Sequence, residues 1–565
     1  MARKKGNPVL DPWYPWDFEK PRPAGARDGE RFKLFLAWKT YLWYFIGYLL
    51  VPACLFHSAL RKGWILESGN LLAPWTVWAA LVWILTASRI SKALPDSLLQ
   101  GSLTVNLSRR RRLGTVALAA GLCLFCGWVF LKFSAYLEAC PGACDWGVAF
   151  SLCPGLGFLV WGLYYVSDFV RGLFKKSPEY HLDTWYPKDF EGPLGKKNEV
   201  EVAHWSDIHL TARDGDTAVA GDKGDNEKFG QVLRAAGGKL KGVDILLASG
   251  DVADAGRASE WHVFFSRVPP ALFKKMVLLP GNHDMNIVDP SDWFMVEGQG
   301  RLLRKKRLIR AMAALNRVQG KRAWIQAPDK SGKTQWLLLG NYLDGFKDSF
   351  REFLDELSRL QERKPRFWDY FRPPVGAWIF GKKDRLEALA QEVDRAWGQI
   401  FPMAVKVPGT AVVFLVFNSN KEDTGIVDNA LGELPLSALG RLDSMREKFG
   451  QGPVLYSLHH HVALPHFNQG FLGEVQVDMM ALLNAGDFIQ KLLAQGPSVV
   501  FHGHRHIGYT GILNGKIQIL SAPSTTLGNE LEPKTKRTPG FYSFRVALKG
   551  PMRIVGRRFW KAGVA

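Results

Sequence analysis

The sequence predicts two structural classes in one chain, an all-α transmembrane domain of four helices followed by an α/β domain. Four long apolar runs lie before residue 170, and from about residue 198 short apolar runs alternate with helical patterns. A length of 565 residues leaves room for two or more domains, and 47% apolar residues exclude a disordered chain. All six cysteines precede residue 154, which excludes a disulfide-stabilised fold for the remainder.

The four apolar runs contain no acidic, basic or histidine side chain. They cover residues 41–56, 71–88, 113–131 and 147–167. A transmembrane helix needs about 17–25 such residues, and the first run reaches that length if Lys39 and His57 extend to the membrane surface. Buried helices of a globular domain are the alternative, but the region has no amphipathic helices to cover them. We therefore expect four membrane spans.

The distribution of Lys and Arg predicts the orientation of these spans. Residues 1–34 carry eight and loop 89–112 carries six, whereas loop 57–70 carries two and loop 133–146 none. Positively charged loops stay in the cytoplasm, so we expect an integral protein of the inner or plasma membrane with the large domain after the fourth span in the cytoplasm. Cys140 and Cys144 then lie on the opposite side, where a disulfide and two free thiols are both possible.

An 11-residue element occurs twice. Residues 11–21 read DPWYPWDFEKP and residues 183–193 read DTWYPKDFEGP, so eight of eleven positions are identical. Our hypothesis is that the two copies pack at the membrane interface or hold the soluble domain as a pair. An incidental aromatic linker is the alternative.

The chain divides into four segments. These are a cytoplasmic N-terminal segment (1–34), a four-helix transmembrane domain (35–171), a linker with the second copy of the repeat (172–197) and an α/β domain (198–565). The last carries a helical insert at about 297–405, because the gap between Asp284 and Val412 far exceeds an ordinary βα connection.

The insert begins with a basic run and continues with two amphipathic helical patterns. The run comprises Arg301, Arg304, Lys305, Lys306, Arg307 and Arg310, and the helices carry apolar residues from Phe346 to Leu360 and from Leu386 to Ile400. The insert is either a helical cap packed on the sheets or a lid whose basic face meets anionic lipid or a phosphorylated substrate. Both roles can hold together.

Seven short apolar runs predict buried strands in the α/β domain. They are 200–205, 245–248, 277–279, 412–417, 454–458, 498–501 and 517–520. Five of them lead directly into groups of Asp, Asn or His, namely SDIHL, SGDVAD, PGNHD, SLHHH and HGHRH. Side chains at strand ends can converge on one site. Oxygen and imidazole ligands without thiolate favour two divalent ions such as Mn, Fe or Zn, with one carboxylate shared.

This ordered set of motifs resembles the calcineurin-like metallophosphoesterase superfamily over about residues 198–546, and within it the cyclic-nucleotide phosphodiesterase branch. The resemblance implies a four-layer α/β/β/α sandwich with a two-metal site. It implies that Asp207, His209 and His506 bind the first ion, that Asn282, His459 and His504 bind the second, and that Asp251 bridges them. His283 is similar to the histidine that stabilises or protonates the leaving oxygen, with Asp284 as its orienting partner.

Some positions stay open at this stage. His460 is an alternative to His459 as a ligand, while His204 and His502 are expected to be structural or to support the ligands. Gly250, Gly281 and Gly503 are expected to allow sharp turns at the strand ends.

We expect a membrane-anchored, metal-dependent phosphohydrolase that uses a bridging hydroxide, most specifically a phosphodiesterase. One alternative is hydrolysis of a phospholipid or nucleotide-linked lipid diphosphate at the membrane surface. The net charge of +20 suggests a nuclease, but much of the excess lies beside the spans. A non-catalytic membrane sensor is a further alternative. The expected partners are a phosphoester substrate and membrane lipid, not nucleic acid, and no oligomeric state is predicted.

Overall fold

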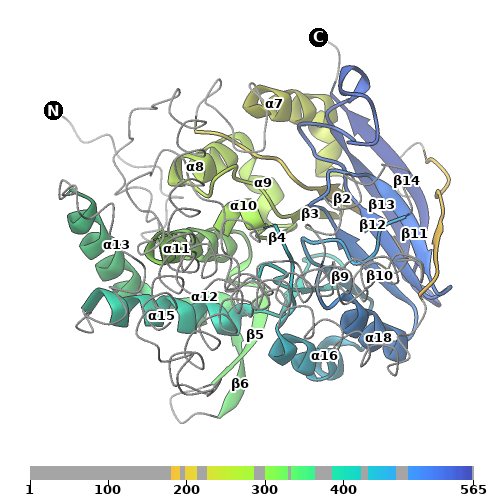
Figure 1. Cartoon of the computed structure of the whole chain (residues 1–565). Coiled ribbons are helices and arrows are strands. Elements are labelled where there is room, and N and C mark those ends of the chain that lie inside the picture. Colours follow the sequence, from red (N-terminus) through yellow and green to blue (C-terminus); the bar gives the residue numbers. More distant parts are fainter. Residues whose placement is uncertain are drawn as a thin grey trace, which may run out of the picture. The chain divides into compact units, whose positions relative to one another are not determined.

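The computed structural model describes residues 180–190, 198–212, 225–285, 300–328, 333–362, 385–421, 430–465 and 482–562. The segments predicted at 1–34 and 35–171, with the four spans, the first repeat copy, Cys140 and Cys144, lie outside these residues. Within the described ranges, no helix has the length and apolar character needed to cross a membrane. The described residues belong to one unit of the chain, and its mixed α/β fold confirms the predicted class of the larger part (Figure 1).

Two sheets form the centre of this domain. The smaller has the order β14 (Arg553–Lys561), β13 (Gly540–Ala547), β2 (Glu199–Trp205), β3 (Ile245–Ser249) and β4 (Met276–Leu279). The larger has nine strands, in the order β1 (Leu182–Thr184), β11 (Tyr509–Leu513), β12 (Ile517–Ser521), β10 (Ser498–His502), β9 (Val454–Ser457), β8 (Val413–Val416), β7 (Met403–Lys406), β5 (Ala323–Pro328) and β6 (Thr334–Leu338). All seven predicted strands are present, as β2, β3, β4, β8, β9, β10 and β12.

Helices lie on the outer faces of the two sheets. Side chains alternate along a strand. In β2, the ring of Trp205 lies 5.5 Å from that of Phe229 in α7 (Asp225–Ala236), whereas the ring of His204 lies 5.3 Å from that of Phe501 in β10. The smaller sheet therefore has a helix on one face and the larger sheet on the other.

The larger sheet likewise has a helix, α18 (Ala485–Gln495), on one face and the smaller sheet on the other. Tyr456 in β9 contacts Phe488 of α18, while its neighbour Leu455 belongs to the main hydrophobic core together with Phe501. The resulting order of layers is helix, sheet, sheet and helix. Among the described residues, the other α-helices outside the insert are α8 (Ala258–Arg267), α9 (Pro270–Phe273), α10 (Asn282–Met285) and α16 (Leu436–Phe449).

The central strands of both sheets are parallel to their neighbours. Strand β3 pairs in parallel with β2 and β4, and β10 pairs in parallel with β9 and β12. Parallel strands end at the same edge of a sheet, where α/β proteins commonly bind ligands. The loops that carry the predicted ligands leave the carboxyl ends of β2, β3, β4, β9 and β10.

The insert contains the two predicted amphipathic helices, α13 (Lys347–Glu362) and α15 (Arg385–Ile400), together with α11 (Gly300–Gln319) and α12 (Leu339–Asp344). It is not purely helical, because β5, β6 and β7 extend the larger sheet. In β5, AWIQAP, buried side chains alternate with more exposed ones, although Ala323, Trp324 and Ile325 are all apolar and show no alternation in the sequence.

The basic run lies in α11 and does not form an exposed basic face in the described part of the insert. Arg307 and Arg310 are buried, and Arg310 Nη1 donates a hydrogen bond of 2.8 Å to the carbonyl oxygen of Gly256. Lys305 pairs with Asp394 of α15. These contacts favour the cap over the lid.

Candidate metal centre

The ligand loops hold their residues in an unusual backbone conformation. Positive φ angles, between 49° and 76°, occur at Asp207, His209, Asp251, His504 and His506. Among the described non-glycine residues the only other case is Asn514, in the turn between β11 and β12. Such a conformation costs about 1–3 kcal/mol for each residue and persists where the surroundings enforce it, as at functional sites.

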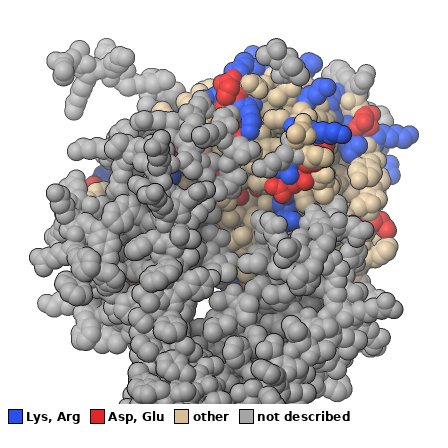
Figure 2. Space-filling view, turned by 45° about the horizontal axis from the view of Figure 1, so that its top comes forward, with Lys and Arg blue, Asp and Glu red and all other residues tan. Residues whose placement is uncertain are grey.

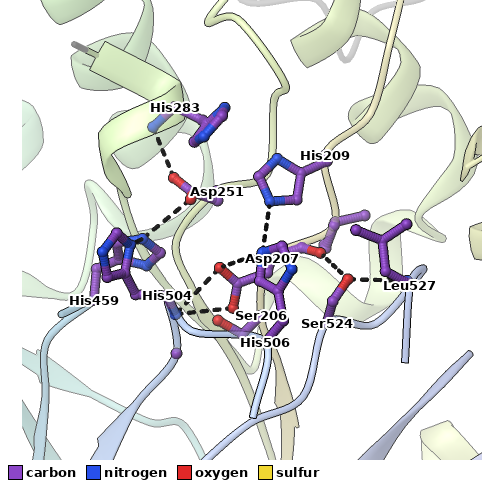
Figure 3. A network of polar contacts seen from close by, with 12 residues as sticks. Ser206, Asp207, His209, Asp251, His283, His459, His504, His506, Ser524 and Leu527 are labelled. Carbon is purple, nitrogen blue, oxygen red and sulfur yellow. Dashed lines mark hydrogen bonds and ion pairs between the residues drawn. The ribbon is translucent and has the colours of Figure 1, made fainter. Parts of the chain in front are cut away.

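A first cluster contains Asp207, His209 and His506, whose ligand atoms lie within 4.8 Å of one another (Figure 3). The Nε2 atoms of the two histidines are 3.1 Å apart, and His506 Nε2 is 3.5 Å from Asp207 Oδ1. These residues come from the loops after β2 and β10, so the structure brings together the three side chains that the sequence assigned to the first ion.

A second cluster surrounds one atom, Nε2 of His459. It lies 3.1 Å from Asp251 Oδ2, 3.2 Å from Asn282 Oδ1 and 3.2 Å from Nδ1 of His504. The other ring nitrogen, Nδ1, bonds to the carbonyl oxygen of Ser249 at 2.8 Å, which leaves Nε2 to face the cluster. The side chains assigned to the second ion thus also lie together.

Asp251 connects the clusters. It belongs both to the group with His459 and His504 and to a third group with His209 and His283. Its position between the sets is the one that a bridging carboxylate would need. The backbone N–H of His504 also donates to both carboxylate oxygens of Asp207, at 3.1 and 3.0 Å, which fixes the loops relative to each other.

The spacing of the ring nitrogens fits divalent ions. Metal–nitrogen bonds of about 2.0–2.1 Å place two adjacent ligands about 2.8–3.4 Å apart, from octahedral to tetrahedral geometry. The pairs His209–His506 and His459–His504, at 3.1 and 3.2 Å, lie in that range. The imidazole, carboxylate and amide donors suit Mn, Fe or Zn.

The electrostatics of the site favour cations. Burial by itself would raise the pKa of Asp251, but the charges of His459 and His283 hold it well below its usual range. Burial would lower the pKa of His459, yet chiefly Asp251 raises it to about 9, and Asp254 and Asp251 raise that of His209 to about 9 as well. A negative field that retains protons on imidazoles also attracts metal ions, which displace those protons on binding.

His283 and Asp284 differ in part from the expectation. Nδ1 of His283 bonds to the carbonyl oxygen of Asp254 at 2.7 Å, so this carbonyl orients the ring. The Asp284 carboxylate instead accepts hydrogen bonds from the backbone N–H groups of Gly281 and Ala253, both at 2.8 Å, and of Val252 at 3.3 Å. Asp284 therefore supports the loops on either side of the site rather than the histidine ring. Burial and the charge of Asp251 raise its pKa to about 7.

Three other buried histidines, His460, His204 and His502, hydrogen-bond to residues outside the ligand groups. Nδ1 of His460 bonds to Ser419 Oγ at 2.9 Å, and His460 belongs to none of the metal-ligand groups in the described residues. This placement favours His459 as the ligand. His204 bonds to Ser249 Oγ at 2.8 Å, and His502 bonds to the Tyr509 hydroxyl at 3.1 Å.

Sequence reasoning missed two acidic residues beside the ligands. Asp254 Oδ1 is 3.6 Å from Nδ1 of His209, and Glu530 Oε1 is 3.4 Å from Nδ1 of His506. Carboxylates in this position fix the ring orientation of metal-binding histidines. Asp254 lies within the SGDVAD motif and could have been assigned, whereas no motif surrounds Glu530.

The three glycines beside the ligands act in different ways. Gly250 has φ = +105°, as expected for a sharp turn. Gly281 and Gly503 do not have positive φ but approach other groups closely, since a Cβ on Gly281 would lie 2.0 Å from Asp251 Oδ1 and one on Gly503 would lie 1.8 Å from Ser206 Oγ. Close contact, rather than backbone conformation, requires glycine at these two positions.

Comparison with known proteins gave a match to a family model and matches to solved structures. A family model described as calcineurin-like phosphoesterase matches residues 200–508, which is more than half of the chain. A crystal structure of a dimetal phosphatase from Danio rerio aligns with 12% sequence identity and a TM-score of 0.30, covering 64% of this chain and 99% of that one. No curated protein sequence matches significantly.

Proposed function

We propose that this chain, which belongs to the calcineurin-like phosphoesterase family, is a membrane-anchored phosphodiesterase with a two-metal site. Membership of the family makes it a phosphoester hydrolase that uses divalent metals. The observation that carries this proposal is the convergence of Asp207, His209, His506, Asp251, His459 and His504 in overlapping ligand groups. The four apolar runs at 41–167 and the charge of their loops support membrane anchoring with the catalytic domain in the cytoplasm.

The proposed division of ligands follows the geometry. Asp207, His209 and His506 would hold one ion, Asn282, His459 and His504 the other, and Asp251 would contribute to both. When bound, such ions neutralise phosphoryl charge and lower the pKa of a water molecule, so that a nucleophile is present at neutral pH. The chain itself supplies the fixed strand ends that set the positions of these side chains before substrate arrives.

We infer that His283 acts on the leaving oxygen. One of its ring nitrogens lies within 4.8 Å of ligand atoms of His209 and Asp251. Because the carbonyl oxygen of Asp254 can only accept, Nδ1 carries a hydrogen, and Nε2 donates a proton or a hydrogen bond to substrate only when the ring is doubly protonated. A donor at this position would assist departure of an alcohol from phosphorus.

The test is hydrolysis of bis(p-nitrophenyl) phosphate by the full-length protein in detergent with Mn²⁺. We expect Asp251→Asn to reduce kcat/KM by more than the about 10–100-fold that loss of an outer-shell partner costs. Asp443→Asn, at an exposed position in α16, is the matched control and should keep wild-type activity. Equal rates for wild type and Asp251→Asn would refute the assignment. A strong preference for p-nitrophenyl phosphate would instead indicate a phosphomonoesterase.

A lipid-linked substrate is the second candidate, because the predicted spans would place the site beside a bilayer. Cleavage of a nucleotide-linked lipid diphosphate or a phospholipid in mixed micelles, with no cleavage of cyclic nucleotides, would favour it. A nuclease has less support. On the face shown in Figure 2, the described Lys and Arg side chains are interspersed with Asp and Glu rather than gathered in one patch.

A further inference from the structure

The second copy of the repeated element is not a free linker. Its strand β1 pairs antiparallel with β11 at the edge of the larger sheet, with Leu182 opposite Leu513 and Thr184 opposite Gly511. The N–H of Trp185 donates to the carbonyl oxygen of Thr510 at 3.0 Å, and the Thr510 hydroxyl donates back to the carbonyl oxygen of Trp185. The segment thus adds an edge strand to the phosphoesterase domain.

Beyond this strand, arginines of β13 and β14 bind the aromatic and acidic side chains. The ring of Phe190 lies 3.9 Å from the guanidinium of Arg545 and 4.3 Å from that of Arg558. Arg557 Nε donates to Asp189 Oδ1 at 3.1 Å, and its guanidinium lies 5.1 Å from the ring centre of Tyr186. We call β11 together with Arg545, Arg557 and Arg558 the repeat-binding surface.

The first copy repeats the side chains that make these contacts. Aligned from Leu10 and from Leu182, residues 10–21 and 182–193 are identical at nine of twelve positions. The shared residues of the first copy are Leu10, Asp11, Trp13, Tyr14, Pro15, Asp17, Phe18, Glu19 and Pro21. They include the counterparts of Trp185, Tyr186, Asp189 and Phe190.

The copies differ at two described positions, and at both of them the side chain of the second copy points to solvent, so that the surface accepts other side chains there. The side chains of Thr184 and Lys188 are exposed. Lys188 contacts Arg557 only through its backbone, because the backbone N–H of Arg557 donates to the carbonyl oxygen of Lys188 at 3.0 Å. The first copy has Pro12 and Trp16 there.

Proline fits at the position of Thr184 because hydrogen bonds alternate along an edge strand. The carbonyl oxygen of His181 accepts from the N–H of Asn514, directly after β11, and the N–H of Trp185 donates to Thr510 in β11. Asp183, midway between them, therefore faces β11, and the N–H of Thr184 faces away. A proline whose missing N–H points away from the sheet is tolerated in an edge strand.

We propose that residues 10–21 are a second ligand of the repeat-binding surface and can replace residues 182–190 on it. The same backbone pairing, arginine–aromatic contacts and ion pair are available to both segments. Because the copies flank the predicted spans, this exchange changes which end of residues 22–181 is held against the phosphoesterase domain. The inference does not depend on the catalytic assignment.

The test in the full chain uses redundancy between the copies. Trp185→Ala with Phe190→Ala removes the anchors of the second copy, and Trp13→Ala with Phe18→Ala removes those of the first. We expect the first-copy variant to keep the wild-type melting temperature of the phosphoesterase domain and the second-copy variant to melt a few degrees lower. The combined variant should melt lower still, by more than the sum of the decreases in the two separate variants. Equal melting temperatures for the combined variant and the second-copy variant would overturn the proposal.

A binding experiment keeps the proposal testable if the combined variant does not fold. A fluorescent peptide of residues 8–23 is titrated into the full chain carrying only Phe18→Ala and Phe190→Ala, so that both internal copies are weakened and compete less with the peptide. We expect it to bind at least about 10-fold more tightly than the peptide with Trp13→Ala and Phe18→Ala, a difference of about 1.4 kcal/mol.

The receptor variant Arg557→Ala should weaken binding of the wild-type peptide by a similar factor. Arg553→Ala, an exposed position in the same strand, should not. Equal binding of both peptides, or no dependence on Arg557, would refute the exchange.

Discussion

Replacing Gly281 with alanine should disable the site without changing any ligand. Gly281 follows β4 and stands directly before Asn282, and its N–H donates to Asp284. A Cβ at this position would lie 2.0 Å from Asp251 Oδ1 and 2.4 Å from the Asp251 backbone nitrogen. The clash therefore involves both the side chain and the backbone of the residue that joins the two clusters.

The size of the effect follows from the overlap. Real Cβ atoms do not approach other heavy atoms closer than 3.0 Å, so Asp251 or Gly281 must move by roughly 1 Å. A displacement of about 1 Å in a positioned group can reduce the rate by about 10²-fold. Inserting a methyl group into a packed interior also costs about 1–3 kcal/mol of stability.

The assay compares kcat/KM for bis(p-nitrophenyl) phosphate, bound metal and melting temperature. Gly440→Ala is the matched control, because Gly440 lies in α16 and no neighbouring atom lies within 4 Å of the position that a Cβ would take. Alanine in place of glycine stabilises a helix by up to about 1 kcal/mol. We expect full activity for Gly440→Ala and about a 10²-fold loss for Gly281→Ala. Wild-type kcat/KM and metal content in Gly281→Ala would show that the geometry around Asp251 is not as described.

Three further outcomes follow from the site. His459→Ala should abolish metal-dependent hydrolysis, while His460→Ala should keep most of it and mainly lower the melting temperature, because His459 belongs to a metal-ligand group in the described residues and His460 does not; the reverse order in a rate assay would exchange their roles. His283→Ala should slow substrates with poor leaving groups by about 10²–10⁴-fold and p-nitrophenyl esters much less, and an equal loss for both series would exclude proton donation. Burial raises the pKa of Glu260 from 4.5 to about 8, so the folded protein holds this proton more tightly than the unfolded chain and loses stability as the pH rises from about 4.5 to about 8. Glu260→Gln lacks this loss, so its melting temperature should rise relative to wild type across that range, whereas a constant difference would contradict the raised pKa.

The sequence predicts the catalytic half well because its signals are local. Each buried strand is a short apolar run, and each ligand follows the end of a strand, as Asp251 follows β3 and His459 follows β9. Parallel pairing then brings these ends together. This is why seven strands and the grouping of the ligands could be foreseen from the chain alone.

Features that depend on distant contacts could not be foreseen. The partner of the His283 ring is a backbone carbonyl, which carries no residue signature, and the neighbour of His506, Glu530, lies outside every motif. The position of Arg310 in a run of basic residues suggests exposure to solvent, yet Arg310 is buried and donates a hydrogen bond to the carbonyl oxygen of Gly256. In each case tertiary contacts decide the role of a residue whose type is ambiguous.

The strands of the insert show a related difficulty. Residues 403–406, MAVK, form β7, whose neighbours β5 and β8 are supplied by segments on either side in the sequence. Four residues are too few to show the alternation of a strand against helical surroundings. A helical insert was therefore predicted where the structure also extends the sheet.

The most direct test of the account is the anomalous scattering from crystals of the Mn²⁺-loaded protein. We predict two peaks about 3.5–4 Å apart, as in other two-metal sites, one beside Asp207, His209 and His506 and the other beside Asn282, His459 and His504, with Asp251 between them. A single peak, or peaks away from these side chains, would contradict the two-metal centre.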